Sequence, residues 1–356
     1  MADRPTYRLD DYDYELPGRL IAQSPAPQRD RCRLLVLHRT SGRLEHRSFR
    51  DLPDYLQAGD VLVLNDTRVV PARLLGRKDT GGRVELLVLD PYKDPGVGVR
   101  EGYRCLLKAS KPPRRGSRLF LEQEVMARVM GEVREGRVTV RFETGSPLLE
   151  ILERAGRVPL PPYIRRNDDA VSFEDGMDYQ TIYAAKPGAI AAPTAGLHFT
   201  ENLLGCLEEK GVETVRLTLH VGYGTFSPIR VEDIREHGIH AEWTEIGEEA
   251  SQRIREARRA GRRVVAVGTT VVRALEYTAA RFGEVSPFAG FCDHYIYPGF
   301  RFRVVDALVT NFHLPKSSLI LLVSAFAGRE TILAAYAEAV RKEYRFYSYG
   351  DAMLIV

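Results

Sequence analysis

The chain has 356 residues, of which 44% are hydrophobic and 28% are charged, and its formal net charge is +3. This length and composition are sufficient for a large core and more than one domain, and they exclude disordered and fibrous proteins. The first residues lack the pattern of a signal peptide and no apolar run has the length of a membrane span, so we predict a cytoplasmic protein without a membrane partner.

Positive charge is concentrated in one segment. Between Pro71 and Arg141 there are 16 Lys and Arg against 9 Asp and Glu. A basic module on a mildly acidic body is typical of proteins that bind the phosphate backbone of nucleic acids, although a solvated basic surface gives the same composition. Arg114 and Arg115 are the candidate nucleic-acid contacts in this segment.

The spacing of the cysteines argues against a metal centre. The four cysteines lie far apart, at Cys32, Cys105, Cys206 and Cys292. This spacing matches neither a zinc ribbon nor a disulfide framework. We therefore expect buried thiols, no disulfides and no metal.

Polar residues follow an early buried strand. The apolar run Val61–Leu64 predicts a strand that is covered on both faces. It ends in Asn65, Asp66, Thr67 and Arg68. The carboxyl ends of strands are where open α/β sheets bind ligands, so these four residues are site candidates, with an ordinary Asx-turn as the alternative.

The pattern of hydrophobic and polar residues changes between residues 69 and 145. Short alternating runs such as Val84–Leu89 and Val138–Phe142 are separated by Gly-rich or Pro-rich turns, which is an all-β pattern. We predict a small basic β-barrel domain over 69–145, inserted into an α/β main domain formed by 1–68 and 146–356. An amphipathic helix is expected to follow the barrel, ending near Gly156.

Two Gly-rich loops flank one predicted helix. The first, Ala189–Thr200, is built from small residues and contains Pro193, Thr194, Gly196 and His198, with Thr200 placed to cap the helix. A tight connector is the alternative. The second loop follows an alternating strand and carries His220, Gly222, Tyr223, Gly224, Thr225 and Phe226. Backbone N–H groups at a helix N-terminus favour anionic or electron-rich ligand groups.

The segment His237–Glu242 leaves three interpretations open. His240 and Glu242 are possible zinc ligands, a catalytic His and Glu pair, or surface residues. No helical spacing and no further ligand set supports the metal.

Two later strands also end in polar residues. The apolar run Val264–Val267 leads into Gly268, Thr269 and Thr270, which open a helix that contains Arg273. The second strand ends in Asn311, Phe312 and His313. The aromatic and basic C-terminal segment 344–351 is a possible surface for stacking on bases.

These motifs together resemble the S-adenosylmethionine:tRNA ribosyltransferase-isomerase family, which forms epoxyqueuosine in queuosine biosynthesis. The resemblance rests on residues 65–74, 192–199, 220–226, 268–270 and 310–315, in the order of the family, and covers nearly the whole chain. It implies an α/β body with an inserted β-barrel. It also implies transfer of the ribosyl part of S-adenosylmethionine to 7-aminomethyl-7-deazaguanine in the tRNA anticodon, with release of adenine and methionine.

The implied chemistry assigns roles to the motif residues. The sulfonium acidifies the ribose C5′ protons, so a protein base can start the reaction without a metal. His220 is our first choice of base and His198 the second, since a neutral imidazole suits proton transfer near pH 7. Asp66 would orient a histidine or a ribose hydroxyl. The remaining candidates would bind substrate. Hydroxyls and amides of Thr194, Thr269 and Thr270 would hold its polar groups, and Arg68 or Arg273 would pair with the methionine carboxylate. Tyr223 or Phe226 would stack on a base.

Two other functions were weighed against this one. A non-catalytic tRNA-binding protein would need only the basic barrel and would leave the His and Gly loops unexplained. A methyltransferase would have a Gly-rich turn after its first strand and an acidic residue after its second, a pattern we do not find. We expect tRNA and S-adenosylmethionine as partners, no permanently bound cofactor, and a monomer.

Overall fold

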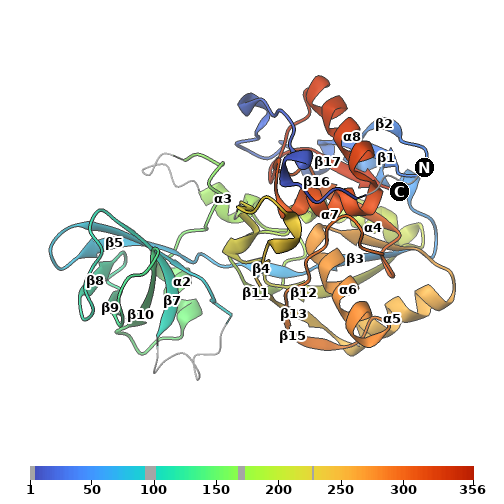
Figure 1. Ribbon diagram of the computed structural model, residues 1–356. Helices are drawn as coiled ribbons and strands as arrows, with labels where there is room; N and C mark the ends of the chain where they lie inside the picture. Colours follow the sequence, from blue (N-terminus) through green and yellow to red (C-terminus); the bar gives the residue numbers. More distant parts are fainter. Residues whose placement is uncertain (1–4, 93–101, 167–172, 227) are drawn as a thin grey trace.

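The computed structural model describes residues 5–92, 102–166, 173–226 and 228–356, and within them a nine-stranded mixed sheet forms the main body (Figure 1). Its strand order is β15-β13-β12-β3-β14-β16-β17-β1-β2. The neighbours β12, β3, β14 and β16 run parallel, and antiparallel strands extend both sides. The bounds are β1 (Arg33–His38), β2 (Arg43–Ser48), β3 (Val61–Asn65), β12 (Glu213–Leu219), β13 (Glu242–Ile246), β14 (Val264–Val267), β15 (Phe288–Cys292), β16 (Ala307–Asn311) and β17 (Ala352–Ile355).

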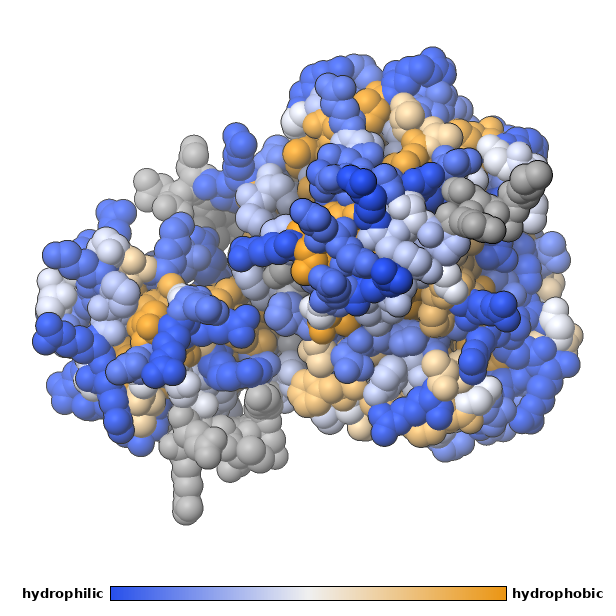
Figure 2. Space-filling model, in the orientation of Figure 1, coloured by the Kyte–Doolittle hydropathy of each residue, from blue (hydrophilic) through white to orange (hydrophobic). Residues whose placement is uncertain are grey.

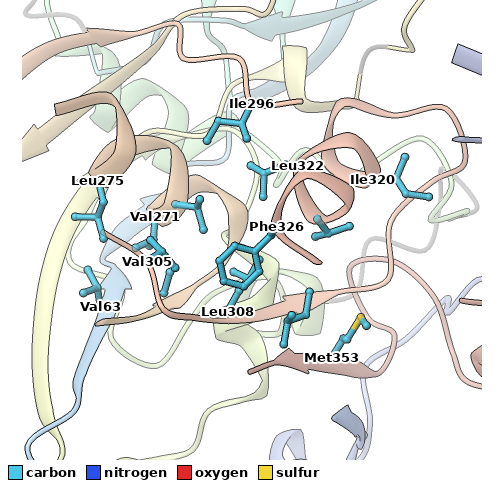
Figure 3. Packing of buried hydrophobic residues seen from close by; sticks show 14 of the residues in the cluster. Val63, Val271, Leu275, Ile296, Val305, Leu308, Ile320, Leu322, Phe326 and Met353 are labelled. Carbon is cyan, nitrogen blue, oxygen red and sulfur yellow. The ribbon is translucent and has the colours of Figure 1, made fainter. Parts of the chain in front are cut away.

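Hydrophobic clusters cover both faces of this sheet. Successive residues of a strand point to opposite faces. Val61 and Val63 of β3 accordingly pack in one cluster, whereas Leu62 and Leu64 pack in the other. Figure 3 shows the first cluster, where Val271 lies near strand residues and Phe326 comes from a C-terminal helix. The principal helices are α4 (Glu201–Glu209), α5 (Glu248–Arg259), α6 (Thr269–Phe282), α7 (Ser318–Ala327) and α8 (Arg329–Arg341).

A closed six-stranded antiparallel barrel stands beside the body, which confirms the predicted fold class (Figure 1). Its described strands follow in the order β10-β7-β6-β5-β8-β9. Their side chains alternate between buried and exposed, as in β10, because one face of each strand fills the barrel. The bounds are β5 (Arg73–Lys78), β6 (Arg83–Val88), β7 (Tyr103–Ala109), β8 (Arg118–Leu121), β9 (Met126–Val129) and β10 (Arg137–Phe142).

The two chain segments that join barrel and body pair with each other in an antiparallel β-bridge. Arg73 and Arg157 exchange backbone hydrogen bonds, with N···O distances of 3.1 and 2.8 Å. Gly156 permits this close approach, since a Cβ there would lie 1.8 Å from the carbonyl oxygen of Pro71. Helix α2 (Leu148–Ala155), which the predicted boundary at residue 145 places in the main domain, packs in the barrel's hydrophobic cluster.

Short elements complete the body. Strands β4 (Thr67–Val69) and β11 (Lys186–Ala189) pair in parallel next to the barrel connection. The others are α3 (Phe173–Asp178) and the 3-10 turns η1 (Leu9–Tyr12), η2 (Gly18–Leu20), η3 (Arg29–Arg31), η4 (Phe49–Tyr55), η5 (Thr194–His198), η6 (Tyr223–Phe226) and η7 (Ile234–Glu236).

The surface is mainly hydrophilic on the face seen in Figure 2, over both barrel and body. The C-terminal aromatic residues do not contribute to it. Tyr344, Phe346, Tyr347 and Tyr349 are all buried, so the expectation that this segment offers rings for base stacking is wrong. In the described part of the chain no single helix meets the length and hydropathy of a membrane span; α7 and α8, bent by 114°, meet them only as a pair.

Candidate active site

The carboxyl ends of the central parallel strands place several motifs at one edge of the sheet. Asn65, the last residue of β3, connects two of them. Its side-chain NH2 donates to the carbonyl of Leu219 at 2.9 Å and approaches Thr270 Oγ1 at 3.4 Å. Its Oδ1 accepts from the backbone N–H groups of Thr67 and Leu219 at 3.1 and 3.0 Å. Asn65 therefore fixes the backbone that presents the following residues.

His220 lies directly after β12 in this edge. Its Nδ1 is 2.8 Å from Thr67 Oγ1, and the ring of Tyr92 stacks on the imidazole with centroids 5.2 Å apart. Burial lowers the pKa of His220 to about 4. The imidazole is therefore neutral at pH 7, the form that a proton acceptor requires.

Asp66 precedes the residue that holds His220, and its own carboxylate is held by a different group. Thr218 Oγ1 donates to Asp66 Oδ1 at 2.6 Å. Burial raises the pKa of this carboxyl group. The contact that orients His220 comes from Thr67 instead, which leaves a substrate hydroxyl as the proposed partner of Asp66.

His198 occupies a second, fully buried cluster. Asn311 Nδ2 donates to His198 Nε2 at 3.0 Å, and His198 Nδ1 is 3.2 Å from Cys32 Sγ. Thr194 Oγ1 donates to the other end of the Asn311 amide at 2.9 Å. Burial lowers the pKa of His198 to about 3. Nε2 thus links η5 to the end of β16, and Nδ1 links it to Cys32, which directly precedes β1; this geometry is suited to a structural role.

The remaining residues of that strand end lie deeper. Phe312 is fully buried and its ring packs against Tyr336, Tyr344 and Phe346. His313 Nε2 is 2.8 Å from Thr310 Oγ1, and burial lowers its pKa to about 3. The side chain of Phe312 therefore belongs to the core behind the site.

The second Gly-rich loop is organised by a buried ion pair. Glu242 Oε1 accepts from the N–H of Gly222 at 2.8 Å and from Thr225 Oγ1 at 3.0 Å. Glu242 Oε2 binds Arg273 Nη1 at 2.5 Å, and the two side chains are only 4% and 6% exposed. Among the described residues the Glu242 carboxylate joins η6 to α6 and makes no hydrogen bond to the His240 side chain.

A small pocket adjoins this pair. Gly224 is necessary there, because a Cβ would lie 2.2 Å from the ring of His240. Tyr223 is 43% exposed, and the side chain of Phe226 lies outside the described residues. The lining consists of Gly224, Thr225, His237, Ile239, His240, Glu242, Arg273, Ser318 and Leu319. The guanidinium of Arg273 already binds Glu242, so its charge is balanced before any substrate carboxylate arrives.

Other candidates lie at helix starts or on the surface. Gly268 has φ +93° and precedes α6, where Thr269 and Thr270 begin the helix with nearly buried side chains. In η5, Gly196 follows Pro193 and Thr194 and packs so closely that a Cβ would lie 2.1 Å from Tyr183 Oη. Arg68 binds Glu153 Oε1 at 3.1 Å near the barrel connection. Arg114 and Arg115 are exposed on the barrel.

Tyr92, Gly188 and Trp243 also belong to this site and were not predicted. Tyr92 lies on His220, and a Cβ at Gly188 would lie 2.6 Å from His220 Cε1. No sequence motif surrounds these three residues. The one available signal was Tyr92 itself, an aromatic residue in the turn after β6. Among the described residues there is no group of three or more His, Cys, Asp or Glu that could hold a metal ion. The absence of a metal stays a prediction.

Comparison with known proteins gives consistent matches over the whole chain. The model of the family described as queuosine biosynthesis protein matches residues 9–355. The S-adenosylmethionine:tRNA ribosyltransferase-isomerase of Pelobacter propionicus is 52% identical over 97% of this chain and 98% of its own. The enzyme of the same name from Symbiobacterium thermophilum is 50% identical over 98% and 100%.

A solved structure agrees with these sequence matches. The crystal structure of S-adenosylmethionine tRNA ribosyltransferase from Thermotoga maritima covers 97% of this chain and 100% of its own at 37% identity, with a TM-score of 0.55. The relatives carry the names of enzymes, which favours catalysis over the alternative of a non-catalytic tRNA-binding protein.

Proposed function

The chain belongs to the queuosine biosynthesis protein family, and we infer that it catalyses the reaction for which its relatives are named. It transfers and isomerises the ribosyl group of S-adenosylmethionine onto tRNA. The acceptor is 7-aminomethyl-7-deazaguanine at the anticodon wobble position, and the products are epoxyqueuosine in tRNA, adenine and methionine. The observation that carries this inference is identity of about half the residues over nearly the full length of enzymes with that name.

We propose His220 as the base that begins the reaction. Its pKa of about 4 keeps the imidazole neutral, and Nδ1 is held by Thr67. The sulfonium of S-adenosylmethionine acidifies the C5′ protons, so a neutral imidazole can remove one of them. Loss of adenine then gives a vinyl sulfonium, the amine of the tRNA base attacks it, and closure of the epoxide expels methionine.

His198 is less suited to this role. Its two ring nitrogens are bound to Asn311 and Cys32, and its burial is complete. Proton transfer to it would require these contacts to break. We propose that it supports the loop that carries Thr194 and Gly196, which lies against the carboxyl end of β16.

The polar residues at the sheet edge are proposed to bind S-adenosylmethionine. The first-turn N–H groups of α6, at Thr269 and Thr270, suit its carboxylate or ribose oxygens because a helix N-terminus favours negative charge. The Asp66 carboxylate would accept a hydrogen bond from a ribose hydroxyl. Exposed Tyr223 is available for stacking on a planar base. No permanently bound cofactor or metal is required.

The barrel is proposed to bind the anticodon arm. It carries the local excess of positive charge and the exposed Arg114 and Arg115. Phosphate contacts of this kind position a nucleic acid without reading its sequence. The protein would act as a monomer in the cytoplasm.

One assay tests the proposed reaction. The protein is mixed with S-adenosylmethionine and an anticodon stem-loop that carries 7-aminomethyl-7-deazaguanine, and nucleoside mass and small products are followed. We expect the mass gain of an epoxycyclopentanediol group with release of adenine and methionine. Formation of S-adenosylhomocysteine would indicate methyl transfer instead, and binding of both substrates without any product would contradict the proposal.

A further inference from the structure

The barrel contributes a side chain to the candidate site on the body. Tyr92, in the turn after β6, lies with its ring at 19° to the His220 imidazole and at 25° to Trp243, with centroid distances of 5.2 and 6.2 Å. His220 and Trp243 are neighbours on adjacent strands, since the N–H of His220 donates to the carbonyl of Trp243 at 2.9 Å. Tyr92 therefore covers both rings at once.

The backbone at Gly188 lies close to both the imidazole and Tyr92. Gly188 in β11 has φ +154°, and a Cβ there would lie 2.6 Å from His220 Cε1, 2.7 Å from Nε2 and 2.8 Å from Tyr92 Cβ. An alanine at this position would displace one of these groups. The glycine is thus the point at which the body, the histidine and the barrel segment meet.

Tyr92 is itself anchored within the barrel. Its hydroxyl donates to Asp90 Oδ1 at 3.3 Å, and Arg104 of β7 binds the other carboxylate oxygen at 2.6 Å. The position of the Tyr92 ring therefore follows the position of the barrel. In the body, the same ring also contacts Phe291, with centroids 6.5 Å apart.

We propose that Tyr92 is a positioning residue for the reaction: it holds the His220 imidazole against Gly188 and shields it from water, so that the placement of the barrel governs the base. This rests on the proposed function, in which His220 accepts the first proton. The stacking of Tyr92 on His220 would thereby link a barrel that binds tRNA to the proposed catalytic base in the body.

The electrostatics of His220 agree with this geometry. Burial is the main cause of its lowered pKa, while Glu245 raises the pKa and Lys186 lowers it. These two charges pair with each other at 3.4 Å and their effects oppose. Because desolvation dominates, removal of the covering ring of Tyr92 should allow water to reach the imidazole and raise its pKa toward the ordinary value.

The experiment compares Tyr92→Ala and Tyr92→Leu with Tyr92→Phe, which keeps the ring, and with Phe120→Ala. Phe120 is a barrel ring that is 45% exposed, on strand β8, which pairs only with barrel strands. The His220 titration is followed by NMR with labelled histidine, assigned with His220→Gln. The pH profile of kcat/KM is measured on the same proteins with the modified stem-loop.

We expect the pKa of His220 to rise by about one pH unit or more in Tyr92→Ala and Tyr92→Leu. The acid limb of kcat/KM should move with it, which at pH 5 amounts to a loss of about twofold for a rise of one unit and about tenfold for a rise of two units, beyond any loss at pH 8. Tyr92→Phe and Phe120→Ala should titrate as the unchanged protein does.

Two outcomes separate this proposal from the one on which it rests. An unchanged His220 titration in both Tyr92→Ala and Tyr92→Leu would overturn the shielding role of Tyr92. A shifted titration with an unshifted kcat/KM profile would retain the contact but show that His220 is not the base, which would also overturn Tyr92 as a positioning residue for the reaction.

Discussion

At the scale of single residues, the proposed chemistry depends on an imidazole that stays neutral. His220 is kept so by burial, with Thr67 at Nδ1 and Tyr92 on one face. Its lowered pKa places the change of charge near pH 4, well below neutral pH. The proposed base is therefore neutral and ready to accept a proton at pH 7.

We predict that His220→Gln lowers kcat by about a hundredfold or more, since loss of a general base typically costs 10²–10⁴. Both substrates should still bind, because the amide can keep the contact with Thr67 Oγ1. His38→Gln, at a surface pair with Glu45, serves as the control and should leave turnover unchanged. Single-turnover formation of product measures the effect, and equal rates in the two variants would exclude His220 as the base.

Buried histidines also make stability depend on pH. His313 has a pKa of about 3 in the folded state, below the ordinary value near 6.5 of an unfolded chain. Between these values the unfolded state binds more protons, so the contribution of the neutral histidine is complete above about pH 6.5 and is lost as pH falls toward 3. Acid therefore favours unfolding through this residue.

We predict that His313→Gln, which cannot titrate, is less stable than the unchanged protein at pH 7 and that this difference shrinks at lower pH. The expected change is about 1.4 kcal/mol per pH unit below pH 6, because one proton is linked to unfolding. Urea unfolding at pH 7 and pH 5 measures it, with exposed His240→Gln as the control. A pH-independent difference would contradict a neutral buried His313.

At the scale of elements, the buried pair of Glu242 and Arg273 joins the second Gly-rich loop to helix α6. One carboxylate oxygen holds Gly222 and Thr225, and the other holds the guanidinium. Burial of two charges is tolerated because each has its partner and further hydrogen bonds. The pair therefore fixes the loop that follows His220.

We predict that Arg273→Met destabilises the fold by about 3–5 kcal/mol, because it leaves the Glu242 carboxylate buried without a counter-charge. The double variant Glu242→Gln with Arg273→Met should recover part of this loss, since the glutamine is neutral and its oxygen still accepts from Gly222. Urea denaturation of both proteins gives the comparison. A double variant no more stable than Arg273→Met would show that charge pairing is not the cause.

At the scale of the whole molecule, the basic β-barrel and the α/β body both contribute side chains to the candidate site at His220. The paired segments at Arg73 and Arg157 connect them, and Tyr92 extends from the barrel to the body. In Figure 1 the barrel stands apart from the main sheet, next to β4 and β11. A long acceptor such as tRNA can contact both units only if their relative placement suits it.

We predict that Arg114→Gln with Arg115→Gln weakens tRNA binding and lowers the slope of log K against log salt by up to about 2, which is the release expected for two phosphate contacts. Binding of S-adenosylmethionine should not change. Arg281→Gln with Arg301→Gln removes the same charge from exposed positions on the body and is the control. Fluorescence anisotropy over a salt series measures both, and an equal loss in the two double variants would refute a specific role for the barrel.

Much of the architecture follows from local patterns. The apolar run at Val61–Leu64 predicted a buried strand and Thr200 predicted a helix cap, and both are confirmed, with Thr200 Oγ1 accepting from the N–H of Leu203 at 3.2 Å. The alternating runs predicted the barrel. These features depend on residues close together in the chain, so composition and periodicity suffice to find them. The C-terminal tyrosines were misjudged, since polarity along the chain does not reveal packing against distant residues such as Tyr163 and Tyr179.

The sequence by itself determined the family, the division into an α/β body and a β-barrel, and the loops that carry the candidate residues, because motifs and periodicity are local properties. Only the tertiary structure decided which side chains meet: Tyr92 with His220, Glu242 with Arg273, and His198 with Asn311 and Cys32. Those partners are far apart in the chain and are brought together by strand order and barrel placement. Their desolvation, which sets the pKa of each histidine, exists only once the surrounding elements have packed.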